Sequence, residues 1–168
     1  PDGNFLPPFP LNCAEQHLRE SVVKAFPERI VTPGRVANIS KYNPDSHTGT
    51  RGQCQTRGRC SRGCPYGAYF SSLSATIPVA LETGNLTIRP DSVVSEVVWD
   101  KELGKASGVR VKDANTGEEL EFYSRIIFCN ASTVGTTAIL LNSRSDEFPD
   151  GLGNNSGELG HNMMDHHY

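Results

Sequence analysis

The fold is decided by residues 125–143, RIIFCNASTVGTTAILLNS. The apolar run at 126–129 predicts a short strand that is buried on both faces of a sheet. Small and polar residues follow it and predict a sharp turn, with Ser132 or Thr133 as the N-cap of a helix. Apolar residues then recur at helical spacing, so one side of this helix can pack on the sheet. A strand that enters a helix through small residues favours nucleotide binding, although ordinary connections in α/β domains share the pattern.

Three β-type segments precede this stretch. Valines at 93–98 and alternating residues at 109–111 and 120–122 predict strands, and turn signals at 103–104 and 115–117 separate them. Short connections between successive strands favour antiparallel pairing. We therefore predict an α/β fold, α+β within this chain, in which a three-stranded antiparallel meander is followed by a buried strand and a helix.

The first half of the chain has fewer regular elements. Its proline-rich opening predicts extended structure, and Asn12 with Glu15 has the spacing of a capping box at the start of a helix. We expect a strand at 28–39, a second helix at 72–83 and a short strand at 85–89.

Composition narrows the class of protein. The 16 basic and 19 acidic residues give a net charge of -3, which argues against nucleic-acid binding and against broad attraction to anionic lipid. No apolar run approaches the length of a membrane span, so none is predicted. The chain begins at Pro1 rather than methionine and ends at Tyr168 after an unfinished-looking motif, so we expect an internal part of a longer protein.

A cysteine- and arginine-rich segment, RGQCQTRGRCSRGCPYGAYFSS, occupies residues 51–72. Cys54, Cys60 and Cys64 are separated by five and three residues, and the CxxC pairs typical of zinc and iron–sulfur sites are missing. This spacing favours a disulfide between two of the three, or packed free thiols, over a metal site. The four arginines have no acid among them, which fits a solvated basic loop or a contact with phosphate or an acidic partner.

Several motifs in succession resemble the glucose–methanol–choline flavoprotein oxidoreductases. They are GCPYGA at 63–68, TGNLTIRPDSVVSEVVWD at 83–100, GVRV at 108–111, the stretch 125–143 and GNNSGELGHNMMDHH at 153–167. Their order and spacing resemble the family from about residue 7 to the end of the chain. The GCP-x-GA segment is nearest the bacterial gluconate and sugar dehydrogenase and pyranose oxidase branch.

The resemblance implies an FAD/NAD(P)-binding-type domain that holds FAD. It also implies oxidation of a CH–OH group of a sugar, polyol or other alcohol by hydride transfer to the flavin, with the electron acceptor left open. The family's GxGxxG fingerprint and its catalytic histidine pair do not appear in this sequence. No catalytic residue is therefore assigned, and the chain resembles an internal part of such an enzyme.

Four positions are implied to contact FAD, namely Val94, Asn130, Ala131 and Ser132. The backbone of Val94 resembles the segment that holds the adenine edge. Residues 130–132 replace the family's usual Ala-Gly-Ser type of turn against the adenosine and pyrophosphate. Because Asn130 and Ala131 carry a Cβ where the family has glycine, the resemblance leaves open how closely the backbone approaches the cofactor.

The resemblance divides the chain into four segments. Residues 1–50 form an extended segment, helix and loop, and residues 51–84 form the cysteine/glycine-rich loop and a helix. Residues 85–145 belong to the FAD-binding domain, and residues 146–168 form a Gly/Asn-rich connection toward a substrate domain. Two other functions compete with this one: a metal-binding or redox-thiol module built on Cys54, Cys60 and Cys64, and an interaction domain that uses its arginines to bind an acidic partner.

Overall fold

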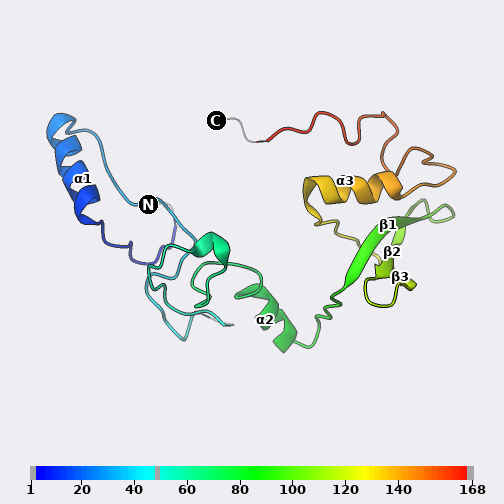
Figure 1. Cartoon of the computed structure of the whole chain (residues 1–168), viewed down its shortest axis with the longest axis horizontal. Coiled ribbons are helices and arrows are strands. Elements are labelled where there is room, and N and C mark those ends of the chain that lie inside the picture. Colours follow the sequence, from blue (N-terminus) through cyan, green and yellow to red (C-terminus); the bar gives the residue numbers. More distant parts are fainter. Residues whose placement is uncertain (1–2, 48–49, 166–168) are drawn as a thin grey trace. The chain divides into compact units, whose positions relative to one another are not determined.

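The computed structural model describes residues 3–47 and 50–165 (Figure 1). The chain divides into two compact units, Pro1–Thr87 and Ile88–Tyr168. The regular elements of the first unit are α1 (Cys13–Ala25), a 3-10 turn (Cys60–Arg62) and α2 (Thr76–Glu82). Those of the second unit are β1 (Ser92–Asp100), β2 (Lys105–Asp113), β3 (Glu119–Tyr123) and α3 (Ser132–Asn142). No helix in the described part of the chain is long and apolar enough to cross a membrane.

The capping box of the first helix is confirmed. The Asn12 side chain accepts a hydrogen bond from the Glu15 N–H at 3.0 Å, and the Glu15 carboxylate accepts the Asn12 N–H at 2.8 Å. Both contacts satisfy N–H groups that a helix start otherwise leaves unpaired. The second helix is also present, with Pro78 in its first turn, but it begins at Thr76 because the preceding residues form a turn on the Ser71 carbonyl.

The three-stranded meander is confirmed as well. Its strands pair in the order β1-β2-β3, both times antiparallel. The register places Val97 opposite Val109, and Val111 opposite both Val94 and Leu120, so the alternating apolar residues share one face. Val97 and Val111 are buried, and β1 carries irregularities between Val94 and Glu96 and between Val98 and Trp99.

Three predicted strands are wrong. Residues 28–39 are irregular apart from one bridge between Asn38 and Tyr69, and residues 85–89 are also irregular. The run at 126–129 forms no strand and is not buried: Ile126 is 69% exposed and Phe128 is 80% exposed. A strand needs a neighbour to accept and donate its backbone hydrogen bonds, and within the described residues nothing pairs with this run.

Helix α3 packs against β1, as the sequence predicts. The anchor is Ser143, which directly follows the helix and is only 5% exposed. Its Oγ accepts the Val97 N–H at 2.7 Å and donates to the Ile139 carbonyl at 2.6 Å. Because β1 is an edge strand of this sheet, the Val97 amide would otherwise be buried without a partner.

A second contact holds the chain beyond α3 on the same strand. The Trp99 ring meets the Phe148 ring edge to face, with centroids 5.0 Å apart, and its indole N–H donates to the Glu147 carboxylate. Residues 147 and 148, shortly after the helix, are therefore fixed to β1.

The anchor can be tested by Ser143→Ala. The change leaves the buried Val97 N–H without an acceptor, so we expect the free energy of unfolding to fall by about 1–3 kcal/mol. Denaturant unfolding of the full-length protein measures the loss, and hydrogen exchange at the Val97 amide localises it. Ser156→Ala is the control, because its hydroxyl is exposed and accepts only a 3.4 Å contact from the Glu158 amide. Equal effects of the two substitutions would contradict the anchor.

The hydrogen bonds of the β2–β3 turn predict that the stability of the folded protein depends on pH. The Asp113 carboxylate accepts the Thr116 N–H at 2.9 Å, the Arg89 guanidinium at 2.6 Å and the Asn115 N–H at 2.9 Å. These contacts, with Thr116 first, lower the pKa of Asp113 from 3.8 to about 2. Because the folded pKa lies below the unfolded one, the stabilisation is present above about pH 4 and is lost as the pH falls toward 2.

The melting temperature should therefore fall more steeply between about pH 4 and pH 2 in the wild type than in Asp113→Asn. Parallel thermal melts of the two full-length proteins across this range measure the difference. The wild type and Asp113→Asn could instead differ in melting temperature by the same amount at pH 4 and at pH 2. That result would contradict the lowered pKa of Asp113 in the folded protein.

Candidate functional site

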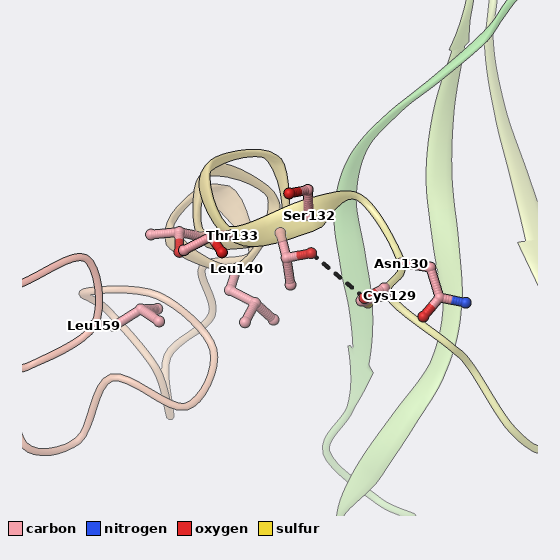
Figure 2. Close-up of a pocket in the computed structure, with 8 residues that line it drawn as sticks. Cys129, Asn130, Ser132, Thr133, Leu140 and Leu159 are labelled. Atoms are coloured by element: carbon pink, nitrogen blue, oxygen red, sulfur yellow. Dashed lines mark hydrogen bonds between the residues drawn. The ribbon is translucent and has the colours of Figure 1, made fainter. Parts of the chain in front are cut away.

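An open pocket of about 590 Å³ lies at the start of α3 in the second unit. Figure 2 shows its lining, with Asn130 and Leu159 on opposite sides of the helix residues. The residues that line it are Cys129, Asn130, Ser132, Thr133, Thr136, Thr137, Leu140 and Leu159. The lining thus combines one amide, four hydroxyls, one thiol and two leucines.

The turn into α3 has an unusual backbone. Ser132 adopts φ +62°, in the left-handed region that residues with a side chain rarely occupy. The Thr136 hydroxyl reaches back and donates to the Cys129 carbonyl at 3.4 Å, the contact drawn in Figure 2. This hydrogen bond joins the first turn of α3 to the segment before the helix. Because Ser132 lies between the two bonded residues, the bond restrains its left-handed conformation.

The predicted N-cap is wrong. The helix begins at Ser132, its N-cap is Ala131, and no side chain of the described residues caps it. Ser132 cannot serve as the cap because it is already inside the first turn in the left-handed conformation. The first backbone N–H groups of α3 are therefore left without the side-chain acceptor that usually satisfies them.

The chemistry of this helix start suits an anionic, hydroxyl-rich ligand. Uncapped N–H groups and the positive end of the helix dipole attract phosphate. Thr133, Thr136 and Thr137 follow at helical spacing; the hydroxyls of Thr133 and Thr137 can both donate and accept, and that of Thr136, which donates to the Cys129 carbonyl, can still accept. The pocket can thus bind a phosphate together with sugar hydroxyls.

The opposite wall comes from the Gly/Asn-rich segment. Leu159 lines the pocket, and the next residue, Gly160, lies so close to α3 that an added Cβ would be 3.3 Å from Thr137 Cγ2. Nearer the helix in sequence, Gly151 is buried at φ +109°, and a Cβ there would be 2.8 Å from the Leu140 carbonyl oxygen. Residues 151–160 of this segment therefore pack on α3 at Gly151 and at Gly160.

The structure brings together some of the residues predicted from the sequence. Asn130 and Ser132 line the pocket, and Ala131 lies between them as the N-cap. Val94 lies half-buried in β1, paired with Val111, and is outside the pocket lining. Their contact with a cofactor stays a prediction.

Sequence reasoning missed most of the remaining lining. The spacing of Thr133, Thr136 and Thr137 on one helix face was available as a signal. Leu159 carried no local signal, because its place in the pocket depends on how the segment after α3 folds back.

The cysteine-rich loop of the first unit forms a separate, small cavity. Cys54, Cys60 and Cys64 all line it, and all three are free thiols. Hydrogen bonds from backbone N–H groups, first that of Tyr69, lower the pKa of the Cys64 thiol. Among residues 3–47 and 50–165, no group of three or more histidine, cysteine or acidic residues is arranged to hold a metal ion.

Comparison with known proteins gives one family. The sequence model described as GMC oxidoreductase matches residues 38–168. A 2-methyl-1,2-propanediol dehydrogenase of Mycolicibacterium austroafricanum is 32% identical over 104 residues, which cover 62% of this chain and 18% of that protein.

Two oxidases are also similar. A 6'''-hydroxyparomomycin C oxidase of Streptomyces lividus is 30% identical over 72% of this chain and 22% of that protein. A paromamine 6'-oxidase of Streptomyces fradiae is 29% identical over 96% of this chain and 29% of its own length. The chain therefore spans less than a third of the length of the relatives it matches.

The left-handed turn generates a prediction. Ser132→Gly should raise the free energy of unfolding by up to about 1 kcal/mol, because glycine adopts this conformation without the Cβ penalty. Ser132→Val should lower it, and denaturant unfolding of the full-length protein measures both. Ser156→Gly is the control, because Ser156 is not in the left-handed region, and glycine there adds chain entropy to the unfolded state and removes only the 3.4 Å contact from the Glu158 N–H. A loss of stability in Ser132→Gly would contradict the left-handed turn.

Proposed function

Because this chain belongs to the GMC oxidoreductase family, we propose that it is part of an FAD-dependent enzyme that oxidises a CH–OH group of an alcohol, polyol or sugar. The observation that carries the proposal is the pocket at the start of α3, where uncapped backbone N–H groups lie next to a row of hydroxyls. One relative is a 2-methyl-1,2-propanediol dehydrogenase, which supports an alcohol as substrate.

The residues present fit the adenosine diphosphate half of FAD. The diphosphate would accept hydrogen bonds from the first N–H groups of α3, which no side chain in the described part of the chain caps. The hydroxyls of Thr133, Thr136 and Thr137 can meet ribose, and Leu140 with Leu159 offers apolar surface to a flat ring. The fit rests on the chemistry of these donors and on the open shape of the pocket.

The roles we assign within this chain are binding and orientation. Asn130 and Ser132 border the phosphate side of the pocket, Ala131 occupies the N-cap position of the helix that faces it, and the backbone of Val94 is proposed to meet the adenine edge. When bound, the flavin would supply the acceptor for the hydride from the CH–OH carbon. We assign no proton-transferring residue to this chain.

A second candidate function is a redox-thiol module in the first unit, since no group of the described residues is arranged to hold a metal ion. It is supported by three free thiols around one cavity and by the lowered pKa of Cys64. Thiol titration and the flavin content of the full-length protein distinguish the two candidates. Rapidly reacting thiols without any flavin would favour the module.

The class of enzyme is tested by the absorption spectrum of the full-length protein. We expect flavin bands in the visible region that bleach anaerobically when a suitable alcohol or sugar is added. A colourless full-length protein that cannot be reconstituted with FAD would overturn the proposal.

The helix start can be tested with an isosteric pair, Ala131→Asp and Ala131→Asn. Both side chains have the same size and both favour an N-cap, so both should leave α3 at least as stable as it is. Only the aspartate places a negative charge beside the proposed diphosphate, so Ala131→Asp should bind FAD at least about tenfold more weakly than Ala131→Asn. Titration of the apoprotein with FAD, followed by flavin fluorescence, measures the ratio. Equal affinities would place the diphosphate elsewhere.

A further inference from the structure

Asn154 is the centre of the hydrogen bonds within the Gly/Asn-rich segment. Its side-chain Nδ2 donates to the Asp150 carbonyl at 3.0 Å, and its Oδ1 accepts the Leu159 N–H at 3.0 Å. Its backbone N–H donates to the Gly151 carbonyl at 3.1 Å, and its carbonyl accepts the Gly157 N–H at 3.1 Å. One residue thus ties together both halves of a loop that has no helix or strand.

This loop rests on the helix that forms the pocket. The Leu152 N–H donates to the Leu140 carbonyl at 2.9 Å, and Gly151 and Gly160 both lie against α3 where a side chain would not fit comfortably. Leu159 therefore reaches the pocket from a loop that lies on α3 at residues 151–152 and at Gly160, and that is joined internally by the hydrogen bonds of Asn154. Figure 2 shows Leu159 approaching the helix on the side away from Asn130.

The side-chain amide of Asn154 suits this place because both of its ends are used. The donor faces a carbonyl and the acceptor faces an N–H, and the reverse orientation would put two donors together and two acceptors together. Aspartate keeps the acceptor but places a charge against the Asp150 carbonyl, and alanine loses both contacts. A glycine-rich loop has much conformational freedom to lose, so these contacts decide how often it adopts the ordered form.

We propose that Asn154 is a positioning residue for the pocket, which acts through Leu159 by holding it against the end of the pocket opposite Asn130. This inference rests on the proposed function in that the pocket is taken to hold the adenosine part of FAD. With Leu159 in place, the ring would lie between apolar surface and the hydroxyls of α3. If Leu159 were not held in place, only a fraction of the molecules would have a pocket able to bind the cofactor. The apparent affinity for FAD would fall by that fraction.

The experiment compares Asn154→Ala with Asn155→Ala in the full-length protein. Asn155 is the adjacent exposed amide, and none of the hydrogen bonds found among the described residues involves its side chain. We expect Asn154→Ala to weaken FAD binding to the apoprotein about tenfold and to speed hydrogen exchange at residues 157–161. Asn155→Ala should change neither quantity by more than about twofold.

A double-mutant cycle with Leu159→Ala tests whether Asn154 acts through Leu159. If it does, Asn154→Ala should add little to the loss of affinity already caused by Leu159→Ala. Fully additive losses, or unchanged affinity in Asn154→Ala, would overturn the proposal. Asn154→Asp, expected to lie between wild type and alanine, replaces Asn154→Ala throughout if the latter does not fold.

The outcome separates this inference from the proposed function. Failure of the wild-type protein to bind FAD would overturn the function and, with it, the role of Asn154 in cofactor affinity. Hydrogen exchange at residues 157–161 is measured without FAD. Unchanged exchange in Asn154→Ala would overturn the positioning role even in a protein that binds FAD normally.

Discussion

The second unit depends on one buried hydrogen bond, from the Val97 N–H to the Ser143 hydroxyl. It joins an edge strand of the meander to the end of α3, across 46 positions of the sequence. The hydroxyl also donates to the helix itself, through the Ile139 carbonyl, so strand and helix share a single side chain. Because the helix is fixed at this end, its other end presents its N–H groups in a defined direction.

The pocket follows from that constraint. Helix α3 is fixed at Ser143 and packs one face against β1. Another face contacts the segment that follows the helix, which is itself held on β1 by the contact between Phe148 and Trp99. The returning segment meets the helix again through the Leu140 carbonyl, so one helix supplies a wall of the meander's core and a wall of the pocket. Binding groups on α3 are therefore held by the packing that stabilises the unit.

Features determined by neighbouring residues could be predicted from the sequence. The capping box of Asn12 and Glu15 depends on residues three apart, and the meander depends on alternation and short turns. The strand expected at 126–129 could not be judged in this way, because its hydrogen bonds require a distant partner. The N-cap was missed because Ser132 adopts a backbone conformation that its residue type does not suggest, and Leu159 was missed because its place depends on tertiary packing.

The Gly/Asn-rich segment shows how opposing demands are met in one loop. Close contact with α3 requires residues without a Cβ, and Gly151 and Gly160 meet that demand. Each glycine increases the conformational entropy that the loop loses on ordering. Glycine therefore favours many loop conformations over the single ordered one that lines the pocket. Side-chain hydrogen bonds from a residue with both a donor and an acceptor offset this loss without adding bulk at the contact. Glycine at the contact points and asparagine between them is therefore the combination that lets an irregular segment line a pocket on α3.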